Sequence, residues 1–334
     1  MEQITREIRK NILLWIGVPA LSLGCNGCNF GLRTTPPSAA SPAAEVAIAG
    51  AKVMIGTGDI ASCGNIGDEG TSKLVDSVLK TNAASNVETV VFTLGDHAYP
   101  MATDRQLRRC FTPSWGDPKK GIMKAIRPAI GNHDWQAARG APYYRYFGPL
   151  AGPAFKGYYS YDIGDWHVVV LNSELAAEAS GEEIAEQEAW LKKDLADNSR
   201  LCTMAYFHRP LFSSAYRQGA PEIRPIWNIL YENNVDLVLS GHDHHYERFE
   251  PLTPTGVLDE AKGIEQILVG TGGATLRGFK SRFGFSAPPP SSHSVARIQG
   301  RFGVLKLTLG SDEYRSAFLE VGGGVWDLSG RKCH

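Results

Sequence analysis

Five short apolar runs, each followed at once by a polar turn, constrain the fold of this chain more than any other feature. The runs span residues 52–57, 89–94, 126–130, 201–207 and 235–240. Each has the length and the aliphatic content of a buried strand. Helical spacing of apolar residues recurs between them, at 71–80, 180–195 and 221–234. Strands that alternate with helices favour parallel pairing in sheets whose faces are covered.

Further strand-like segments follow the same logic. Residues 158–172 and 266–269 contain near-continuous apolar runs, and the region that includes 303–309 is typical of antiparallel strands that close a structure. We therefore expect an α/β fold with four α/β/β/α layers, in which two mixed β-sheets pack face to face and are flanked by helices. The glycine run 270–273 lacks the Lys-Ser/Thr of a P-loop, so we expect it to allow close backbone approach instead.

Composition limits the number of domains and the classes of partner that the chain can have. The chain has 334 residues, of which 43% are hydrophobic, enough for one large domain, which we place at 50–334. Its formal net charge of −1 argues against nucleic acid as a structural partner, because such proteins usually carry a marked basic excess.

The first 25 residues have the pattern of an export signal. Arg6, Arg9 and Lys10 precede a short apolar run, which a small-residue stretch ending at Cys25 follows. The segment 21–25 is similar to a bacterial lipobox, although it has Ser22 where Leu is usual, so lipidation, simple cleavage and a retained anchor all stay open. We expect a signal peptide or lipoprotein signal at 1–25, a flexible tether at 26–49, and an exported protein: periplasmic, secreted, or held at a membrane surface by an N-terminal lipid.

Four cysteines lie outside the export segment, and an even number in an exported protein favours disulfides. They permit three pairings. We favour Cys63 with Cys110 and Cys202 with Cys333.

The polar turns after the five apolar runs are all able to bind metal. They read Gly58-Asp59, Gly95-Asp96-His97-Ala98-Tyr99, Gly131-Asn132-His133-Asp134, Phe207-His208-Arg209 and Gly241-His242-Asp243-His244. A single Gly-Asp turn is usually explained by backbone geometry, because Gly tolerates positive φ and Asp accepts hydrogen bonds from turn amides. The ordered set is more specific, because loops at the carboxyl ends of parallel strands converge.

These turns resemble the motifs of the calcineurin-like metallophosphoesterase superfamily, and within it the purple acid phosphatases, over about residues 50 to 310. The first motif of the superfamily is usually Asp-x-His, whereas this chain has Asp59-Ile60-Ala61 and lacks the histidine. Tyr99 supplies the replacement that purple acid phosphatases use. The resemblance implies a binuclear centre of Fe(III) and a divalent Zn, Fe or Mn. It assigns Asp59, Tyr99 and His244 to iron, Asn132, His208 and His242 to the divalent ion, and Asp96 to the bridge.

The same resemblance implies a mechanism. A hydroxide held by the metals is expected to attack phosphorus directly, and His133 is expected to face the substrate phosphate and protonate the leaving group. We predict that Asp134 orients the His133 ring, although a turn-capping role is an equal alternative. His97 and Arg209 are weaker candidates for substrate contacts, and Tyr216 and Arg217 share the segment of Arg209.

The function that these residues predict is hydrolysis of small phosphate monoesters, as in an acid phosphatase. A phosphodiesterase or nucleotidase could use the same metals. A non-catalytic surface binding protein is disfavoured, because none of the expected metal ligands is missing. The oligomeric state is left open.

Overall fold

The computed structural model describes residues 48–179, 181–215, 219–279 and 291–334, all within one compact unit, Pro36–His334. The expected export signal, nearly all of the expected tether, and Ser180, Tyr216 and Arg217 lie outside the described residues. Within them, no helix is long and apolar enough to cross a membrane.

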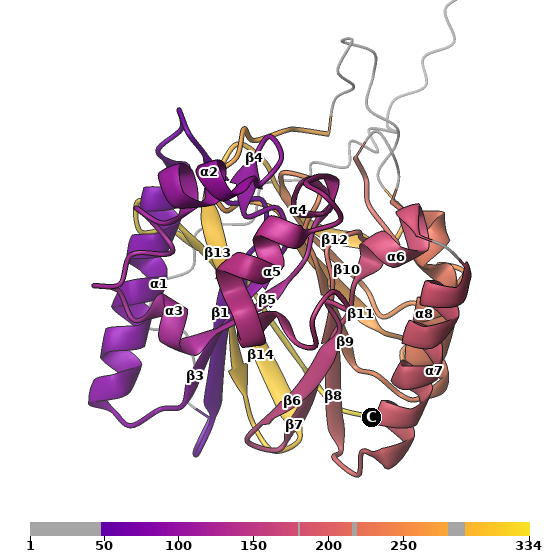
Figure 1. Ribbon diagram of the computed structural model, residues 1–334. Coiled ribbons are helices and arrows are strands. Elements are labelled where there is room, and N and C mark those ends of the chain that lie inside the picture. The colour runs from indigo at the N-terminus through magenta and orange to yellow at the C-terminus, as the bar shows by residue number, and fades with distance from the viewer. Residues whose placement is uncertain (1–47, 180, 216–218, 280–290) are drawn as a thin grey trace, which may run out of the picture. The chain divides into compact units, whose positions relative to one another are not determined.

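Two large mixed sheets form the centre of the described structure (Figure 1). The first has the strand order β15 (Val325–Lys332), β14 (Glu313–Glu320), β13 (Gly303–Leu309), β1 (Lys52–Thr57), β3 (Thr89–Leu94) and β5 (Ile126–Ala129). The second has the order β12 (Ser294–Ile298), β10 (Tyr246–Phe249), β11 (Glu265–Val269), β9 (Leu237–Ser240), β8 (Cys202–Tyr206), β7 (Trp166–Val170) and β6 (Tyr159–Ile163).

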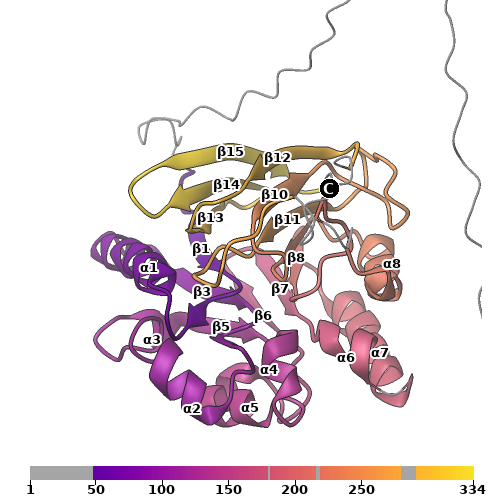
Figure 2. The ribbon, with the colours of Figure 1, turned by 90° about the horizontal axis from the view of Figure 1, so that it is seen from above.

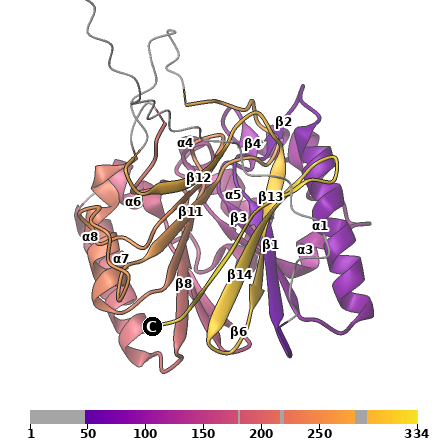
Figure 3. The ribbon, with the colours of Figure 1, turned by 180° about the vertical axis from the view of Figure 1, so that it is seen from behind.

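Strand directions agree with the sequence pattern. The strands β1, β3 and β5 run parallel, as do β7, β8, β9 and β11. The chain ends in the antiparallel series β13, β14 and β15, which extends the first sheet from β1 (Figure 3). The expected mixed sheets with antiparallel closing strands are therefore confirmed.

Helices lie on the outer side of the parallel strands of each sheet (Figure 2). The helices near the first sheet are α1 (Gly67–Ala84), α2 (Asp104–Gln106), α3 (Ile122–Ala125), α4 (Asn132–Gln136) and α5 (Ala141–Phe147), with the π-helical turn η2 (Leu107–Phe111) and the 3-10 turn η3 (Gly148–Ala151). Those near the second are α6 (Ser173–Glu178), α7 (Gly181–Asp197) and α8 (Arg224–Glu232), which the 3-10 turn η4 (Pro221–Ile223) precedes.

Alternation along the strands explains the two cores. In β1, Met54 packs in the core between the sheets, together with Phe92 of β3 and Met204 of β8. The next residue, Ile55, points to the other face and joins the core beneath the helices. Because both faces are buried, every second residue can be apolar on each side, which gives the continuous apolar runs of the sequence.

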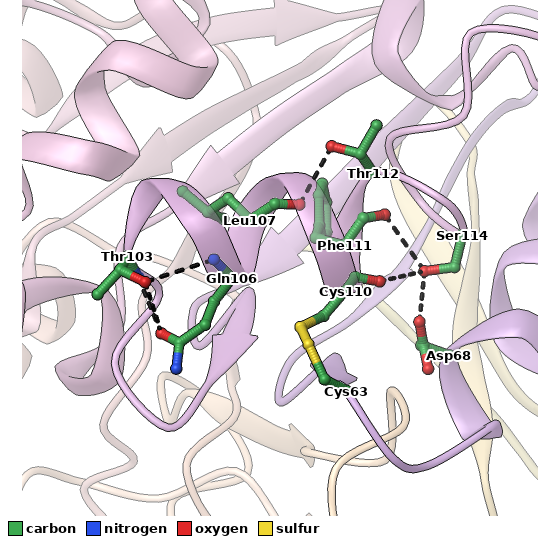
Figure 4. Close-up of a disulfide and its surroundings, with 9 residues drawn as sticks. All are labelled: Cys63, Asp68, Thr103, Gln106, Leu107, Cys110, Phe111, Thr112 and Ser114. Carbon is green, nitrogen blue, oxygen red and sulfur yellow. Dashed lines mark hydrogen bonds between the residues drawn. A yellow bond between two sulfur atoms is a disulfide. The ribbon is translucent and has the colours of Figure 1, made fainter.

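Two disulfides have the pairing that we favoured, Cys63 with Cys110 and Cys202 with Cys333. The first joins the loop after β2 (Ala61–Ser62) to η2 (Figure 4). Cys63 lies shortly after the expected ligand Asp59 in the chain. Strand β2, just before Cys63, pairs with β4 (Ala98–Tyr99), which contains the expected ligand Tyr99.

A buried carboxylate lies beside this disulfide at the start of α1. Asp68 is only 2% exposed, and the Ser114 hydroxyl donates a hydrogen bond to it (Figure 4). Burial raises the pKa of Asp68 from its ordinary 3.8 to about 6, although the hydrogen bond from Ser114 opposes the shift. The folded state therefore binds this proton more tightly than the unfolded chain does.

This shift predicts a pH-dependent effect of Asp68→Asn. Between about pH 4 and pH 6 the contribution of Asp68 to the stability of the wild type falls as the pH rises, because Asp68 must ionise in a buried site. The variant has no such group, so its free energy of unfolding relative to wild type should rise by roughly 1–3 kcal/mol from pH 4 to pH 7. Urea unfolding at both pH values, with the disulfides intact, measures this difference. Parallel stability curves for the two proteins would contradict the assignment.

Candidate metal centre

The ends of five strands bring the expected ligands to one end of the two sheets. Asp59 follows β1, Asp96 follows β3, and Asn132 begins α4 just after β5. From the second sheet, His208 follows β8, while His242 and His244 follow β9. The loops that follow these strands gather at the end where β4 and α4 lie (Figure 1).

Asp59, His244 and Tyr99, the last in β4, form a first cluster. The Tyr99 hydroxyl donates to Asp59 Oδ1 at 2.7 Å and lies 3.0 Å from His244 Nε2. His244 Nε2 is 3.2 Å from the same Asp59 oxygen. One phenol, one carboxylate and one imidazole therefore meet within hydrogen-bond distance of one another.

A second cluster lies beside the first. Asn132 Oδ1 is 3.0 Å from His208 Nε2 and 2.9 Å from His242 Nδ1. The two imidazole nitrogens are 3.2 Å apart. This cluster contains one amide oxygen and two imidazoles.

Asp96 connects the two clusters through one oxygen. Its Oδ2 accepts from the Tyr99 hydroxyl at 2.9 Å and lies 3.4 Å from His208 Nε2. Asp59, Asp96 and His208 each offer a ligand atom within 4.8 Å of the others. The position of Asp96 between the clusters is the one expected of a bridging carboxylate.

Hydrogen bonds outside the clusters orient their imidazoles. His208 Nδ1 donates to the Leu94 carbonyl at 2.6 Å, and His244 Nδ1 donates to the Thr275 carbonyl at 2.7 Å. Because carbonyls only accept, both rings direct Nε2 at the clusters, as metal-binding histidines commonly do. The resulting set of buried lone pairs from imidazole, carboxylate and amide fits a metal site, since cations satisfy such acceptors.

The electrostatics keep the carboxylates ionised. Burial alone would raise the pKa of Asp96, but His208, His133 and His242 outweigh it and hold that pKa well below the ordinary value. His244 does the same for the pKa of Asp59, against the effect of burial. In the second cluster, burial and the charge of His208 lower the pKa of His242 to about 3. Asp59 and Asp96 therefore remain available as metal ligands in acidic solution.

Glycines allow the ligand loops to approach one another closely. A Cβ at Gly131 would lie 2.3 Å from Asp96 Oδ1, and one at Gly95 would lie 2.6 Å from the Gly131 Cα. The run 270–273 also packs against the site, since a Cβ at Gly270 would lie 2.7 Å from Asp59 Oδ2. The expected close backbone approach of this run is confirmed.

His133 lies at the open side of the clusters. Its side chain is 27% exposed, and its ring is 4.5 Å from that of Tyr99. Nδ1 donates to the Pro100 carbonyl, and Nε2 lies 3.9 Å from Asp96 Oδ2. This places Nε2 at the border between the clusters and solvent, a suitable position for a proton donor.

Asp134 does not orient the His133 ring, and that prediction is wrong. Its carboxylate is fully buried and accepts hydrogen bonds from the backbone of Asp96, His97 and Gly131. The alternative of a turn-capping carboxylate describes it better, because these contacts join two ligand loops. The Pro100 carbonyl holds the His133 ring instead.

The two weaker predictions of substrate contacts are also wrong in this structure. His97 is fully buried, and its ring nitrogens bind Thr93 and Asp134 rather than facing the clusters. Arg209 has a side chain only 12% exposed, and its guanidinium binds the buried carboxylate of Glu174 through both Nε and Nη2. A guanidinium so paired has little capacity left for a phosphate.

Sequence reasoning missed two charged residues near the site. Glu174, in α6, neutralises Arg209 behind His208. Arg277 is exposed, its backbone N–H donates to the His244 carbonyl at 3.0 Å, and within the described ranges its side chain has no ion-pair partner. Arg277 follows the Gly270 run, so a motif search centred on the ligand turns could not find it.

A comparison with protein families supports this arrangement. The family described as calcineurin-like phosphoesterase matches residues 53–246, more than half of the chain. The chain belongs to this family. Its members use metal ions and hydrolyse phosphate esters, in agreement with the ligand set described above.

The curated proteins to which the chain is similar include a purple acid phosphatase and an acid phosphatase. Purple acid phosphatase 23 of Arabidopsis thaliana is 30% identical over 189 residues, which are 51% of this chain and 40% of that protein. An acid phosphatase of Aspergillus ficuum is 41% identical over 80 residues, or 23% of this chain and 13% of that protein. This chain thus spans well under two thirds of the length of either relative.

Solved structures show the same fold. Purple acid phosphatase PPD1 from yellow lupin (Lupinus luteus) seeds aligns with a TM-score of 0.65 at 20% identity, over 84% of this chain and 54% of that one. GAP50, named as the anchor in the inner membrane complex of Plasmodium, aligns with a TM-score of 0.63 at 15% identity, over 85% of this chain and 89% of that one. Likeness at this level establishes the expected fold and leaves the activity to the site residues.

The close contact at Gly131 predicts the effect of Gly131→Ala. The backbone angles of Gly131, φ −115° and ψ 176°, suit any residue, so the added methyl acts only by its clash with Asp96. We expect a stability loss of about 1–3 kcal/mol and fewer bound metal ions per chain. Thermal unfolding and elemental analysis measure both. Gly64→Ala is the control, because a Cβ there meets nothing within 4 Å; equal metal content in both variants would contradict the prediction.

Proposed function

We propose that this protein is an acid-phosphatase-like enzyme that hydrolyses small phosphate monoesters at a pair of metal ions. The observation that carries the proposal is the pair of ligand clusters that share Asp96 Oδ2. Two cations held on either side of one carboxylate have the arrangement used for in-line displacement at phosphorus.

The donors differ between the clusters, and this difference supports an iron and a divalent ion. Phenolate and carboxylate oxygens, as in Tyr99 and Asp59, are hard donors that suit Fe(III). Asn132, His208 and His242 suit zinc, iron or manganese in the divalent state. When bound, the metals supply Lewis acidity at the phosphoryl group and acidify the water that serves as nucleophile.

His133 supplies the proton for the leaving group in this proposal. Its Nδ1 is occupied by the Pro100 carbonyl, so Nε2 exchanges the proton that matters. The side chain is 27% exposed, so Nε2 can exchange a proton with solvent after each turnover. The buried residues Asp134 and His97 take no part in this transfer.

Among the described residues, Arg277 is an exposed cation beside His244, and we propose that it holds the substrate phosphate. The backbone of its loop is fixed to the ligand loops by hydrogen bonds from Gly272 N to Gly58 O, at 3.0 Å, and from Ala274 N to Asp59 O, at 2.9 Å. A guanidinium on such a fixed loop can meet phosphate oxygens without a large loss of backbone entropy. Arg209, by contrast, is already paired with Glu174.

Outside the cytoplasm such an enzyme would release phosphate from esters. The basic and apolar N-terminal pattern and the two disulfides support export, whether to the periplasm, to a membrane surface through a lipid at Cys25, or to the medium. The rival functions are a phosphodiesterase or nucleotidase with the same metals, and a surface protein that binds without catalysis.

The first test compares an aryl phosphate with its bis-ester. We expect kcat/KM for the monoester to exceed that for the diester by at least about 10-fold. We also expect Asp96→Asn to lower kcat/KM by on the order of 1,000-fold, because it removes the charge between the clusters. A preference for the diester would favour the phosphodiesterase, and a metal-loaded protein without turnover of either ester would favour the binding protein.

The second test is the visible absorption spectrum of the purified protein. A tyrosinate bound to Fe(III) produces a purple charge-transfer band, so we expect such a band in the wild type and its loss in Tyr99→Phe. Metal content is determined on the same samples, since loss of iron alone would also remove the colour. A colourless wild type with full metal content and activity would contradict the Fe(III)–tyrosinate assignment.

A further inference from the structure

The imidazole ring of His97 lies among three aromatic side chains. Its ring is fully buried, with centroid distances of 5.5 Å to Phe111, 5.4 Å to Tyr143 and 4.7 Å to Phe147. An apolar residue would suit these walls better, since burial of a polar ring requires partners for its nitrogens. Packing alone therefore does not explain why a histidine stands at this position.

Both ring nitrogens have specific partners. Nδ1 lies 2.9 Å from Asp134 Oδ2, and Nε2 lies 2.7 Å from the Thr93 hydroxyl. Because Asp134 Oδ2 also accepts two backbone N–H groups, Nδ1 carries the ring hydrogen and donates a hydrogen bond to this oxygen. The ring thus holds one particular oxygen of Asp134 in place.

That oxygen is the point at which two ligand loops are joined. Asp134 Oδ2 also accepts the backbone N–H of Asp96 at 2.8 Å and that of Gly131 at 3.0 Å. Asp96 has a left-handed backbone, with φ of 56°, which needs support from its surroundings. In return, Asp96 Oδ1 accepts the N–H of His133 at 2.8 Å. The loops after β3 and β5 therefore hold each other through one carboxylate from each.

We propose that His97 is a positioning residue for the metal centre. Its Nδ1–H fixes the Asp134 carboxylate, which fixes the backbone of Asp96 and so places Asp96 Oδ2 between the two clusters. The inference rests on the proposed function only in that the clusters hold metal. The His97 ring hydrogen-bonds to Thr93 and Asp134 rather than to a cluster side chain, and the three aromatic side chains around it keep it from turning away from Asp134.

Two uncharged substitutions separate the hydrogen bond from the packing. The amide nitrogen of His97→Asn can occupy the position of Nδ1 and donate to Asp134. The longer His97→Gln places its amide near the position of Nε2, closer to Thr93. Both remove the ring, so they form a matched pair that differs in the donor to Asp134.

The measurement is the rate at which the full chain loses metal to EDTA, in protein as purified and after loading with Zn²⁺. Thermal unfolding of each variant is followed in parallel. We expect His97→Gln to lose metal about 10–100-fold faster than wild type, the range typical of residues that support metal ligands. We expect His97→Asn to remain within about threefold of wild type.

Equal rates of metal loss in the two variants would overturn the proposal, since the donor to Asp134 would then not matter. If His97→Gln does not fold, the Asn variant decides alone: a folded His97→Asn that loses metal more than about 10-fold faster than wild type overturns it. The readout needs no turnover. A chain that hydrolyses no phosphate ester, yet shows the expected rates, would contradict the proposed function and leave the role of His97 intact.

Discussion

The convergence of acceptor atoms on Asp96 Oδ2 is the constraint on which the rest of the structure depends. Carboxylate, amide and imidazole lone pairs repel one another when they are buried without protons or a cation. Asp59, Asp96 and His208 are nonetheless almost fully buried, with ligand atoms within 4.8 Å of one another. Only a rigid framework can hold such a set, and the two sheets provide it, because Asp59, Asp96 and His208 each follow a strand buried on both faces.

The loops that carry the ligands gain rigidity from contacts between backbone and carboxylate rather than from their own secondary structure. Asp134 accepts the N–H of Asp96, and Asp96 accepts that of His133. Asp59 likewise accepts the N–H of His242 at 2.8 Å, which joins a loop of the first sheet to one of the second. Glycines make these contacts possible, since a Cβ at Gly131 or Gly241 would lie within 2.8 Å of a ligand oxygen.

Two arginines beside the ligand histidines, Arg209 and Arg277, differ in how their side chains are paired. Arg209 lies behind His208 and is neutralised by the buried Glu174, so it contributes to the support of the loop. Arg277 lies beside His244 and is exposed. Under the proposed function, an anionic substrate would meet the Arg277 guanidinium, which has no ion-pair partner among the described residues, at one side of the centre and the His133 ring at another.

The sequence by itself determined the residues that meet in the two clusters, the strands that precede most of them, the mixed sheets and the disulfide pairing that we favoured. These follow from local patterns, because a buried strand and the turn after it are contiguous in the chain. Only the tertiary structure decided the roles of His97, Asp134 and Arg209. The direction of a side chain in a loop depends on left-handed backbone angles, as at Asp96, and on residues distant in the chain, such as Phe147 beside His97 and Glu174 beside Arg209. Spacing in a sequence does not show which buried group a polar side chain will contact. For that reason the residues that support the ligand loops could not be distinguished from residues that would contact a substrate.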